Sequence, residues 1–243
     1  MASLSGDIAA APPGPAPSAA PAPPPPTFPA LLQSTVSQYT LGEYSKSACT
    51  AIALCGAAVL LPLLDAGLPV TAGHLAQAMA AGMEAAAVFE GEHCSAAEVW
   101  AVHQDSPALG GALRAFNVGA ESLGSLSDAA GLEALCAQAR SERGADAARH
   151  TAIVLTKVPE TVCLLLPPVA AAAAGAARFA IFDSHPRPGR ECAHLLSVGS
   201  LEALLAQVRQ LFPALANQPG QEGWDQGVLY QYNVRCAARS CLE

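Results

Sequence analysis

Cys49 occupies the position expected of a nucleophilic cysteine in a chain that contains eight cysteines. It lies in the first turn of a predicted long apolar helix, directly after a polar segment. A helix N-terminus carries about half a positive charge and free N–H groups, so a thiol there has a lowered pKa and is partly thiolate at neutral pH. Cys55, further along the same helix, is interpreted as a buried structural cysteine, and that role is the alternative for Cys49.

Asp183 and His185 supply the base and the orienting group that a nucleophilic thiol needs. They lie in the segment FDSHPRP, at the end of a predicted strand that Pro186 terminates. Side chains at positions i and i+2 of a strand face the same side, so Asp183 can accept a hydrogen bond from the His185 ring while the other ring nitrogen faces the thiol. The alternative is a turn in which Asp183 caps backbone N–H groups and His185 is solvated.

Gln38 is the candidate for the side-chain hydrogen-bond donor that an acyl-transfer site needs. Attack of a thiolate on an acyl group creates an oxyanion, which hydrogen-bond donors stabilise. The backbone N–H of Cys49 is one expected donor, and the side-chain amide of Gln38, upstream in the polar segment, is the other. Gln33 is the weaker alternative. The pattern therefore predicts a Cys-His-Asp site with Gln38 in its oxyanion hole.

Helices are predicted to carry most of the first half of the chain. Apolar residues at helical spacing predict helices over residues 47–60, ended near Pro62, and over 71–90, 95–102 and 132–143. The expected N-caps are Ser45 or Ser47, Thr71, and Ser95, which forms a capping box with Glu98. The Gly- and Ser-rich residues 110–127 are predicted to form a loop.

The second half changes to β-branched and alternating patterns that are typical of strands. Strands are predicted over residues 150–158, 161–166, 178–183, 194–198 and 228–234, with a hairpin at Pro159 and Glu160. An alanine-rich loop over 170–177 and an amphipathic helix over 200–212, capped by Ser200, complete the prediction. Segregated helices and strands indicate an α+β fold, with a helical N-terminal half packed on a mainly antiparallel sheet.

The N-terminal residues differ in composition from everything that follows. Residues 1–30 hold 10 of the 20 prolines of the chain, a composition that disfavours helices and offers little large apolar surface. We expect a disordered tail over 1–30 and a single domain over 31–243. Residues 1–45 also contain neither Lys nor Arg, which argues against a secretory or transit signal, so cytosol or nucleus is the expected compartment.

The charge of the chain and the spacing of its cysteines and histidines also limit the classes of partner and ligand to expect. Twelve basic against 20 acidic side chains give a net charge of -8, and without a basic stripe no nucleic-acid partner is expected. The cysteines show no CxxC spacing and the histidines no HExxH pattern, so we expect free thiols, no metal site and no cofactor. The uncharged residues 48–64 reach only the lower limit of roughly 17 to 25 residues for a spanning helix and are interpreted as a buried core helix, without membrane contact.

Two segments of the chain resemble the active-site blocks of a known family. QYTLGEYSKSACTAIAL, from Gln38 to Leu54, and FAIFDSHPRP, from Phe179 to Pro188, are similar to those of the herpesvirus large tegument protein cysteine protease and its cellular tegument-like deubiquitinase relatives. The alanine-rich residues 170–177 depart from the family. The resemblance implies a papain-like fold and a cysteine-type deubiquitinase that cleaves after the C-terminal glycine of ubiquitin or a ubiquitin-like modifier.

The resemblance also implies the roles of the four site residues. Cys49 would be the nucleophile, His185 the general acid and base, Asp183 its orienting group and Gln38 the side-chain donor of the oxyanion hole. Two other functions remain open on the sequence: a catalytically inactive module of the same fold that binds ubiquitin or another partner, and a papain-fold hydrolase of other amides. A ubiquitin-based covalent probe separates them, because only the first function predicts labelling of Cys49.

Overall fold

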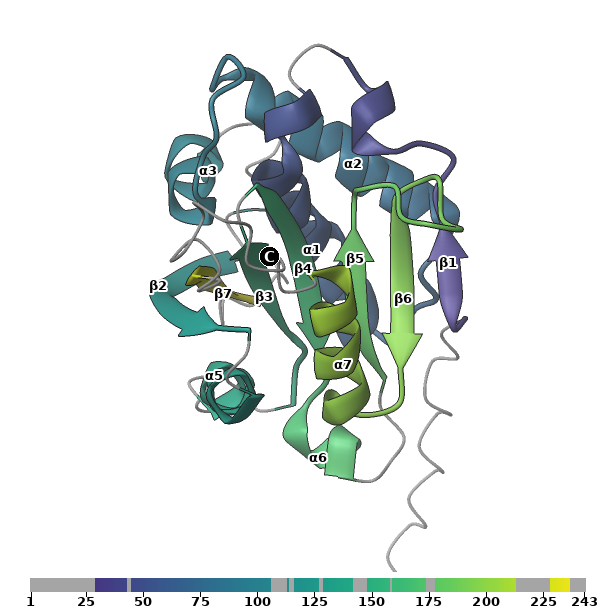
Figure 1. The fold of residues 1–243 in the computed structure, drawn as a ribbon, viewed down its shortest axis with the longest axis vertical. Helices are drawn as coiled ribbons and strands as arrows, with labels where there is room; N and C mark the ends of the chain where they lie inside the picture. The colour runs from purple at the N-terminus through teal and green to yellow at the C-terminus, as the bar shows by residue number, and fades with distance from the viewer. Residues whose placement is uncertain are drawn as a thin grey trace, which may run out of the picture.

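The fold is α+β in the computed structural model of the chain, with helices on both faces of an antiparallel sheet (Figure 1). The structure describes residues 29–42, 45–105, 113, 116–126, 129–141, 148–157, 159–173, 178–212 and 228–236. The predicted tail, residues 1–30, lies outside the described residues except for its last two.

Seven strands of the described residues form one sheet, in the order β1-β6-β5-β4-β3-β7-β2, and every neighbouring pair is antiparallel. The strands are β1 (Leu31–Gln33), β2 (Phe116–Ser125), β3 (Thr151–Lys157), β4 (Glu160–Leu166), β5 (Phe179–Asp183), β6 (His194–Val198) and β7 (Val228–Cys236). The five strands predicted in the second half are confirmed. The predicted hairpin is confirmed as well, because β3 and β4 turn between Lys157 and Glu160, which are opposite each other.

Side chains of the sheet alternate between two hydrophobic cores, one on each face. The helices are α1 (Cys49–Asp65), α2 (Ala72–Ala87), α3 (Ala96–His103), α5 (Ala129–Ser141), α6 (Val169–Ala173) and α7 (Leu201–Leu211). In β3, Ala152 and Val154 join the core with α1, α2 and α3, whereas Ile153 and Leu155 join the core with α5 and α7. Figure 1 shows α7 on one face of the sheet and α1 behind the other.

Helix α1 is buried on nearly all sides, as an apolar helix without a polar face requires. It packs so closely that a Cβ at Gly56 would overlap the ring of Phe182 in β5, and one at Gly82 of α2 would overlap the backbone of Ile52. Glycine at these two positions lets α1 approach both neighbours. The close packing holds the first residue of α1, Cys49, in a fixed place relative to the strands.

Both ends of α1 differ from the prediction. The cap predicted at Ser45 or Ser47 is wrong: these residues form a short 3₁₀ helix, and Ala48 precedes α1 without a side-chain cap. The predicted end near Pro62 is also wrong, since α1 continues to Asp65. Proline removes one helical hydrogen bond near the end of a helix, and the burial of the surrounding side chains outweighs that loss. None of the helices in the described part of the chain is long and apolar enough to cross a membrane.

The other predicted caps are confirmed. The side chain of Thr71 accepts a hydrogen bond from His74 at the start of α2, Ser95 and Glu98 form the predicted capping box of α3, and Ser200 caps α7. These helices begin where a side-chain oxygen satisfies a free N–H group of the first turn.

Two predicted loops contain regular structure. Within residues 110–127, predicted as loop, residues 116–125 form β2, which pairs with β7 from Phe116 opposite Cys236 to Ser125 opposite Val228. Pairing with a distant strand overrides the low β propensity of its Gly and Ser residues, and a register shift interrupts the pairing. Within residues 170–177, predicted as loop, the alanines up to Ala173 belong to α6, in line with the high helix propensity of alanine.

Candidate active site

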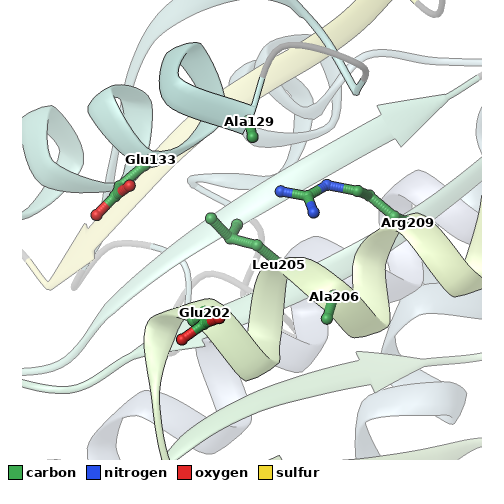
Figure 2. Close-up of a pocket in the computed structure, with 6 residues that line it drawn as sticks. All are labelled: Ala129, Glu133, Glu202, Leu205, Ala206 and Arg209. Carbon is green, nitrogen blue, oxygen red and sulfur yellow. The ribbon is translucent and has the colours of Figure 1, made fainter.

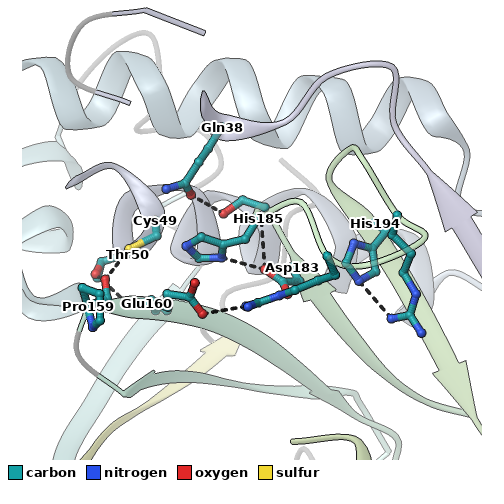
Figure 3. A network of polar contacts seen from close by, with 12 residues as sticks. Gln38, Cys49, Thr50, Pro159, Glu160, Asp183, His185 and His194 are labelled. Atoms are coloured by element: carbon teal, nitrogen blue, oxygen red, sulfur yellow. Dashed lines mark hydrogen bonds and ion pairs between the residues drawn. The ribbon is translucent and has the colours of Figure 1, made fainter. Parts of the chain in front are cut away.

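The structure brings the four predicted site residues together where α1 begins and β5 ends (Figure 3). Gln38 begins a short 3₁₀ helix (Gln38–Thr40), Cys49 is the first residue of α1, Asp183 is the last residue of β5, and His185 follows two residues later. All four are buried, with exposed fractions of 0%, 1%, 0% and 1%. Residues far apart in the sequence thus share one polar cluster inside an apolar surrounding.

Asp183 holds His185 through two hydrogen bonds to one carboxylate oxygen. The ring Nδ1–H of His185 donates to Asp183 Oδ1 at 2.7 Å, and the backbone N–H of His185 donates to the same oxygen at 2.9 Å. Asp183 therefore does cap a backbone N–H group, as the alternative interpretation proposed, but His185 is buried instead of solvated. With Nδ1 bound to Asp183, Nε2 is the ring nitrogen left to face other groups.

The second oxygen of Asp183 binds Arg187, a contact that the sequence analysis missed. Arg187 Nε donates to Asp183 Oδ2 at 2.7 Å, and its Nη2 lies 2.8 Å from Glu160 Oε2 at the tip of the β3–β4 hairpin. Burial raises the pKa of Asp183, but its hydrogen bond with His185 and the positive charges of His185 and Arg187 outweigh burial, so that the pKa is lowered. Arg187 thereby joins the Asp-His pair to the hairpin.

Contacts to the hairpin also place Cys49. Its Sγ lies 3.6 Å from the Pro159 carbonyl oxygen, which accepts the thiol proton of the neutral form. The next residue, Thr50, shares a hydrogen bond of 3.0 Å with Thr161, and Thr161 shares one of 2.9 Å with Thr156. This hydroxyl chain fastens the start of α1 to the two strands of the hairpin.

The Cys49 thiol and the His185 ring are electrostatically coupled, and Figure 3 shows them facing each other. Burial raises the pKa of Cys49, but hydrogen bonds with His185 and Thr161 and the positive charge of His185 outweigh burial, and the pKa is lowered. Burial lowers the pKa of His185, but its bonds with Asp183 and Cys49 outweigh burial and raise the pKa to about 9. The lowered pKa of Cys49 and the raised pKa of His185 both favour the charged pair, a thiolate beside an imidazolium.

Other cysteines of the chain have the opposite electrostatic character. Burial raises the pKa of Cys55 to about 12, that of Cys94 to about 11 and that of Cys136 to about 12. These thiols stay protonated at neutral pH and act as small apolar side chains. Cys49 is buried as well, so burial does not explain why its pKa is lowered. Its contacts with His185 and Thr161 do.

Gln38 carries a buried hydrogen-bond donor without a partner among the described residues. Its side-chain Oε1 accepts a hydrogen bond from the Ser184 hydroxyl at 2.6 Å, whereas Nε2 is buried and unpaired. An unpaired buried donor costs about 1 to 3 kcal/mol. Figure 3 shows this amide in the same cluster as Cys49, so it marks a place for an acceptor such as a substrate oxygen. Gln33, the weaker alternative, is an exposed residue of β1.

Two further residues border the cluster without belonging to the four. Tyr39, next to Gln38 in the sequence, is 49% exposed and packs edge-on to the His185 ring at a centroid distance of 6.0 Å. His194, opposite Asp183 in the β5–β6 pairing, is held by Arg190 and by the Cys192 carbonyl oxygen, each at 3.2 Å. Both ring nitrogens of His194 therefore contact groups other than Cys49. Among the described residues, no group of His, Cys, Asp and Glu side chains could hold a metal ion.

A separate hollow of about 460 Å³ lies between α5 and α7 (Figure 2). It is lined by Ala129, Glu133, Glu202, Leu205, Ala206 and Arg209. The hollow belongs to the face of the sheet opposite α1, and its lining includes neither a nucleophile nor a base next to one. It is therefore not the place where the chemistry of Cys49 and His185 would occur.

Comparison with known proteins supports the fold through structure and not through sequence. No protein-family model matches the sequence, and no curated protein sequence matches it either. Among solved structures, the fold matches a ubiquitin-specific protease encoded by a tegument protein of murine cytomegalovirus, determined in complex with a ubiquitin-based suicide substrate. The TM-score is 0.53 at 12% identity, over 88% of this chain and 89% of the viral chain. The predicted α+β, papain-like fold class is confirmed.

Proposed function

We propose that this chain is a cysteine-type deubiquitinase, a thiol hydrolase that cleaves after the C-terminal glycine of ubiquitin or a ubiquitin-like modifier. The observation that carries the proposal is the buried network in which Asp183 holds His185 and His185 lowers the pKa of Cys49. A low-pKa thiol beside an oriented imidazole is the arrangement that activates a cysteine for attack on an acyl carbon. The same residues carry the sequence resemblance to the tegument-like deubiquitinases.

The reaction then runs through a thioester. The Cys49 thiolate attacks the carbonyl carbon of the glycine, and the oxyanion that forms accepts hydrogen bonds from Gln38 Nε2 and the backbone N–H of Cys49. The His185 imidazolium gives its Nε2 proton to the leaving lysine amine as the C–N bond breaks. Neutral His185 next takes a proton from a water molecule whose oxygen attacks the thioester carbon. The C–S bond breaks, Cys49 leaves as a thiolate beside the His185 imidazolium, and the released glycine carboxyl group loses its remaining proton to solvent.

The assignment of ubiquitin as the substrate rests on two supports. One is the resemblance of the two active-site blocks to the tegument-like deubiquitinases. The other is the likeness in fold to a viral protease that was solved with a ubiquitin-based substrate. The domain of residues 31–243, the N-terminal tail and a cytosolic or nuclear location belong to the same proposal, and neither nucleic acid nor membrane is part of it.

A fluorogenic conjugate, in which the C-terminal carboxyl group of ubiquitin is joined to a dye amine, tests the proposal. We expect the wild-type chain to release the dye and Cys49→Ala to release none above background. Cys55→Ala is the matched control, a buried cysteine of the same helix, and it should keep turnover while lowering thermal stability. Equal dye release by Cys49→Ala and wild type would exclude Cys49 as the nucleophile. Tight binding of ubiquitin without turnover would instead support the inactive binding module.

A further inference from the structure

Ser184, which stands between Asp183 and His185, contacts Gln38 through both its backbone and its side chain. The Ser184 carbonyl oxygen accepts a hydrogen bond from the Gln38 backbone N–H at 3.0 Å. The Ser184 hydroxyl donates to Gln38 Oε1 at 2.6 Å. Both residues are buried. The end of β5, which supplies Asp183 and His185, therefore also holds the Gln38 side chain in the same cluster as Cys49 (Figure 3).

The orientation of the Gln38 amide decides what it can do. A carboxamide has an acceptor end and a donor end of nearly the same shape, and half a turn of its last torsion exchanges them. With Nε2 toward the thiol, the amide donates to an oxyanion. With Oε1 there, lone pairs would face the oxyanion and repel it.

The contact distance and the hydrogen-bond inventory both favour the productive orientation. A separation of 2.6 Å lies in the range of an O–H···O bond and is short for an N–H···O bond. In the reversed orientation the Ser184 hydroxyl proton and the buried Oε1 would both need new partners. In the observed orientation, Nε2 is the one atom of the Ser184–Gln38 side-chain pair left unpaired, and it is the atom that a substrate oxygen would satisfy.

We infer that Ser184 is a positioning residue, whose hydroxyl fixes the Gln38 amide with its nitrogen toward the oxyanion. This inference rests on the proposed function and extends it to a residue that acts through Gln38. Removal of the hydroxyl frees Oε1, so the amide spends part of its time reversed. The expected loss in the acylation rate of Cys49 is about tenfold, smaller than the loss for removing the amide itself.

The test combines Ser184→Ala with Gln38→Ala in a double-mutant cycle, read with two substrates. One is the fluorogenic ubiquitin conjugate, and the other is a small activated ester, p-nitrophenyl acetate, which acylates a reactive thiol without ubiquitin. Ser197→Ala is the matched control, because Ser197 is a buried serine of the neighbouring strand whose hydroxyl has no partner among the described residues. Iodoacetamide alkylation of Cys49, which forms no oxyanion, checks that the thiolate is intact.

We expect Ser184→Ala to lower kcat about tenfold with KM and the alkylation rate unchanged, and Ser197→Ala to change none of them. In the Gln38→Ala background, Ser184→Ala should have no further effect, since the amide it positions is gone. Wild-type kcat in Ser184→Ala, a loss that adds to that of Gln38→Ala, or an equal loss in alkylation would each overturn the inference.

Failure of the proposed function has a different signature. If p-nitrophenyl acetate acylates Cys49 of the wild-type chain but the ubiquitin conjugate is not cleaved, the assignment of ubiquitin as substrate fails. The rates of the same variants with the ester then still decide the role of Ser184. If neither substrate acylates Cys49, the side-chain amide signals of Gln38 in a ¹⁵N-correlated NMR spectrum decide it. A fixed, exchange-protected Gln38 amide in the wild type that broadens in Ser184→Ala supports the inference, and identical signals in the two proteins overturn it.

Discussion

The two ends of α1 each carry an Asp-His pair of nearly the same geometry. Near its start, His185 donates from Nδ1 and from its backbone N–H to one oxygen of Asp183, at 2.7 and 2.9 Å. At its end, His150 donates in the same two ways to one oxygen of Asp65, at 3.0 and 2.7 Å. An aspartate that accepts from the ring and the backbone of one histidine is therefore not by itself a catalytic arrangement.

The two Asp-His pairs differ in how deeply they are buried and in the groups that surround them. The side chains of His185 and Asp183 are 2% and 0% exposed, whereas those of His150 and Asp65 are 14% and 15% exposed. His185 faces the Cys49 thiol, and the amide of Gln38 points into the same cluster. The pair of His150 joins the last residue of α1 to the residue before β3. The thiol, the amide donor and burial make the Asp183–His185 pair a candidate site, whereas the Asp65–His150 pair has a structural role.

Exchange of each histidine for alanine should affect activity in one pair and only stability in the other. His185→Ala removes the general acid and the group that lowers the pKa of Cys49, so kcat/KM for the fluorogenic ubiquitin conjugate should fall by about 10³ to 10⁴. His150→Ala should leave kcat/KM unchanged and lower the free energy of unfolding by about 1 kcal/mol, because the backbone N–H of residue 150 still binds Asp65. Steady-state kinetics and urea unfolding measure the two effects. An essential His150 beside a dispensable His185 would reverse our assignment.

Gln38→Ala removes the side-chain amide that is proposed to donate a hydrogen bond to the oxyanion. The Asp65–His150 pair has no such role. We expect kcat to fall by about 10² to 10³ with little change in KM, because an oxyanion-hole donor acts on the transition state more than on the bound substrate. Gln33→Ala, at an exposed site, is the control and should be nearly silent. An effect of Gln38→Ala on KM alone would recast Gln38 as a substrate-binding contact.

The stability and the activity of the protein should both depend on pH through the buried Asp183–His185 pair. The pKa of His185 is raised from its ordinary 6.5 to about 9, so the stability that the imidazolium contributes is complete below pH 6.5 and is lost as the pH rises through 9. The pKa of Asp183 is lowered from 3.8, so its contribution is complete above pH 3.8 and is lost as the pH falls through the lowered pKa. Activity should fall about tenfold per pH unit above 9, as His185 loses the proton for the leaving amine. It should also fall as the pH drops through the lowered pKa of Cys49, where the thiolate gains a proton. A kcat/KM that rises steadily beyond pH 9 would show that no imidazolium is needed.

Arg187→Ala should lower activity less than His185→Ala or Gln38→Ala. It removes the ion pairs to Asp183 and Glu160 while leaving the Asp183–His185 hydrogen bonds in place. We expect kcat to fall by less than about tenfold and the pKa of Asp183 to rise, since a partly buried positive charge next to Asp183 is lost. Glu160→Gln, which keeps a side-chain acceptor for Arg187, should cost less. Loss of activity as large as for His185→Ala would move Arg187 from a supporting to an essential role.

Much of the site was predictable from local sequence because its chemistry lies in two short segments. A cysteine after a polar stretch and before an apolar helix, and an Asp-x-His at the end of a strand, depend on local periodicity and on the direction of neighbouring side chains. Their contact across the fold did not follow from those patterns. It depends on the close packing of α1 against β5, where the glycine at position 56 meets the ring of Phe182.

The residues that the sequence did not reveal act through tertiary contacts. Glu160 reaches Arg187 from a hairpin turn, and Ser184 reaches Gln38 from the end of β5, so neither contact has a signal in sequence spacing. Arg187 stands four residues after Asp183, and that short separation was the one local sign of their ion pair. Strand β2 was missed for the same reason, because pairing with β7 and not residue propensity makes it a strand.

Cys49, paired with His185, is the proposed nucleophile toward the C-terminal acyl group of ubiquitin. Incubation with ubiquitin that carries a C-terminal electrophile, followed by intact-mass measurement and peptide mapping, tests this role most directly. We predict a single covalent adduct on Cys49 that is absent in Cys49→Ala and strongly slowed in His185→Ala, with Cys55→Ala labelled like the wild type. An adduct on another cysteine, or no adduct under conditions in which iodoacetamide alkylates Cys49 rapidly, would contradict the claim.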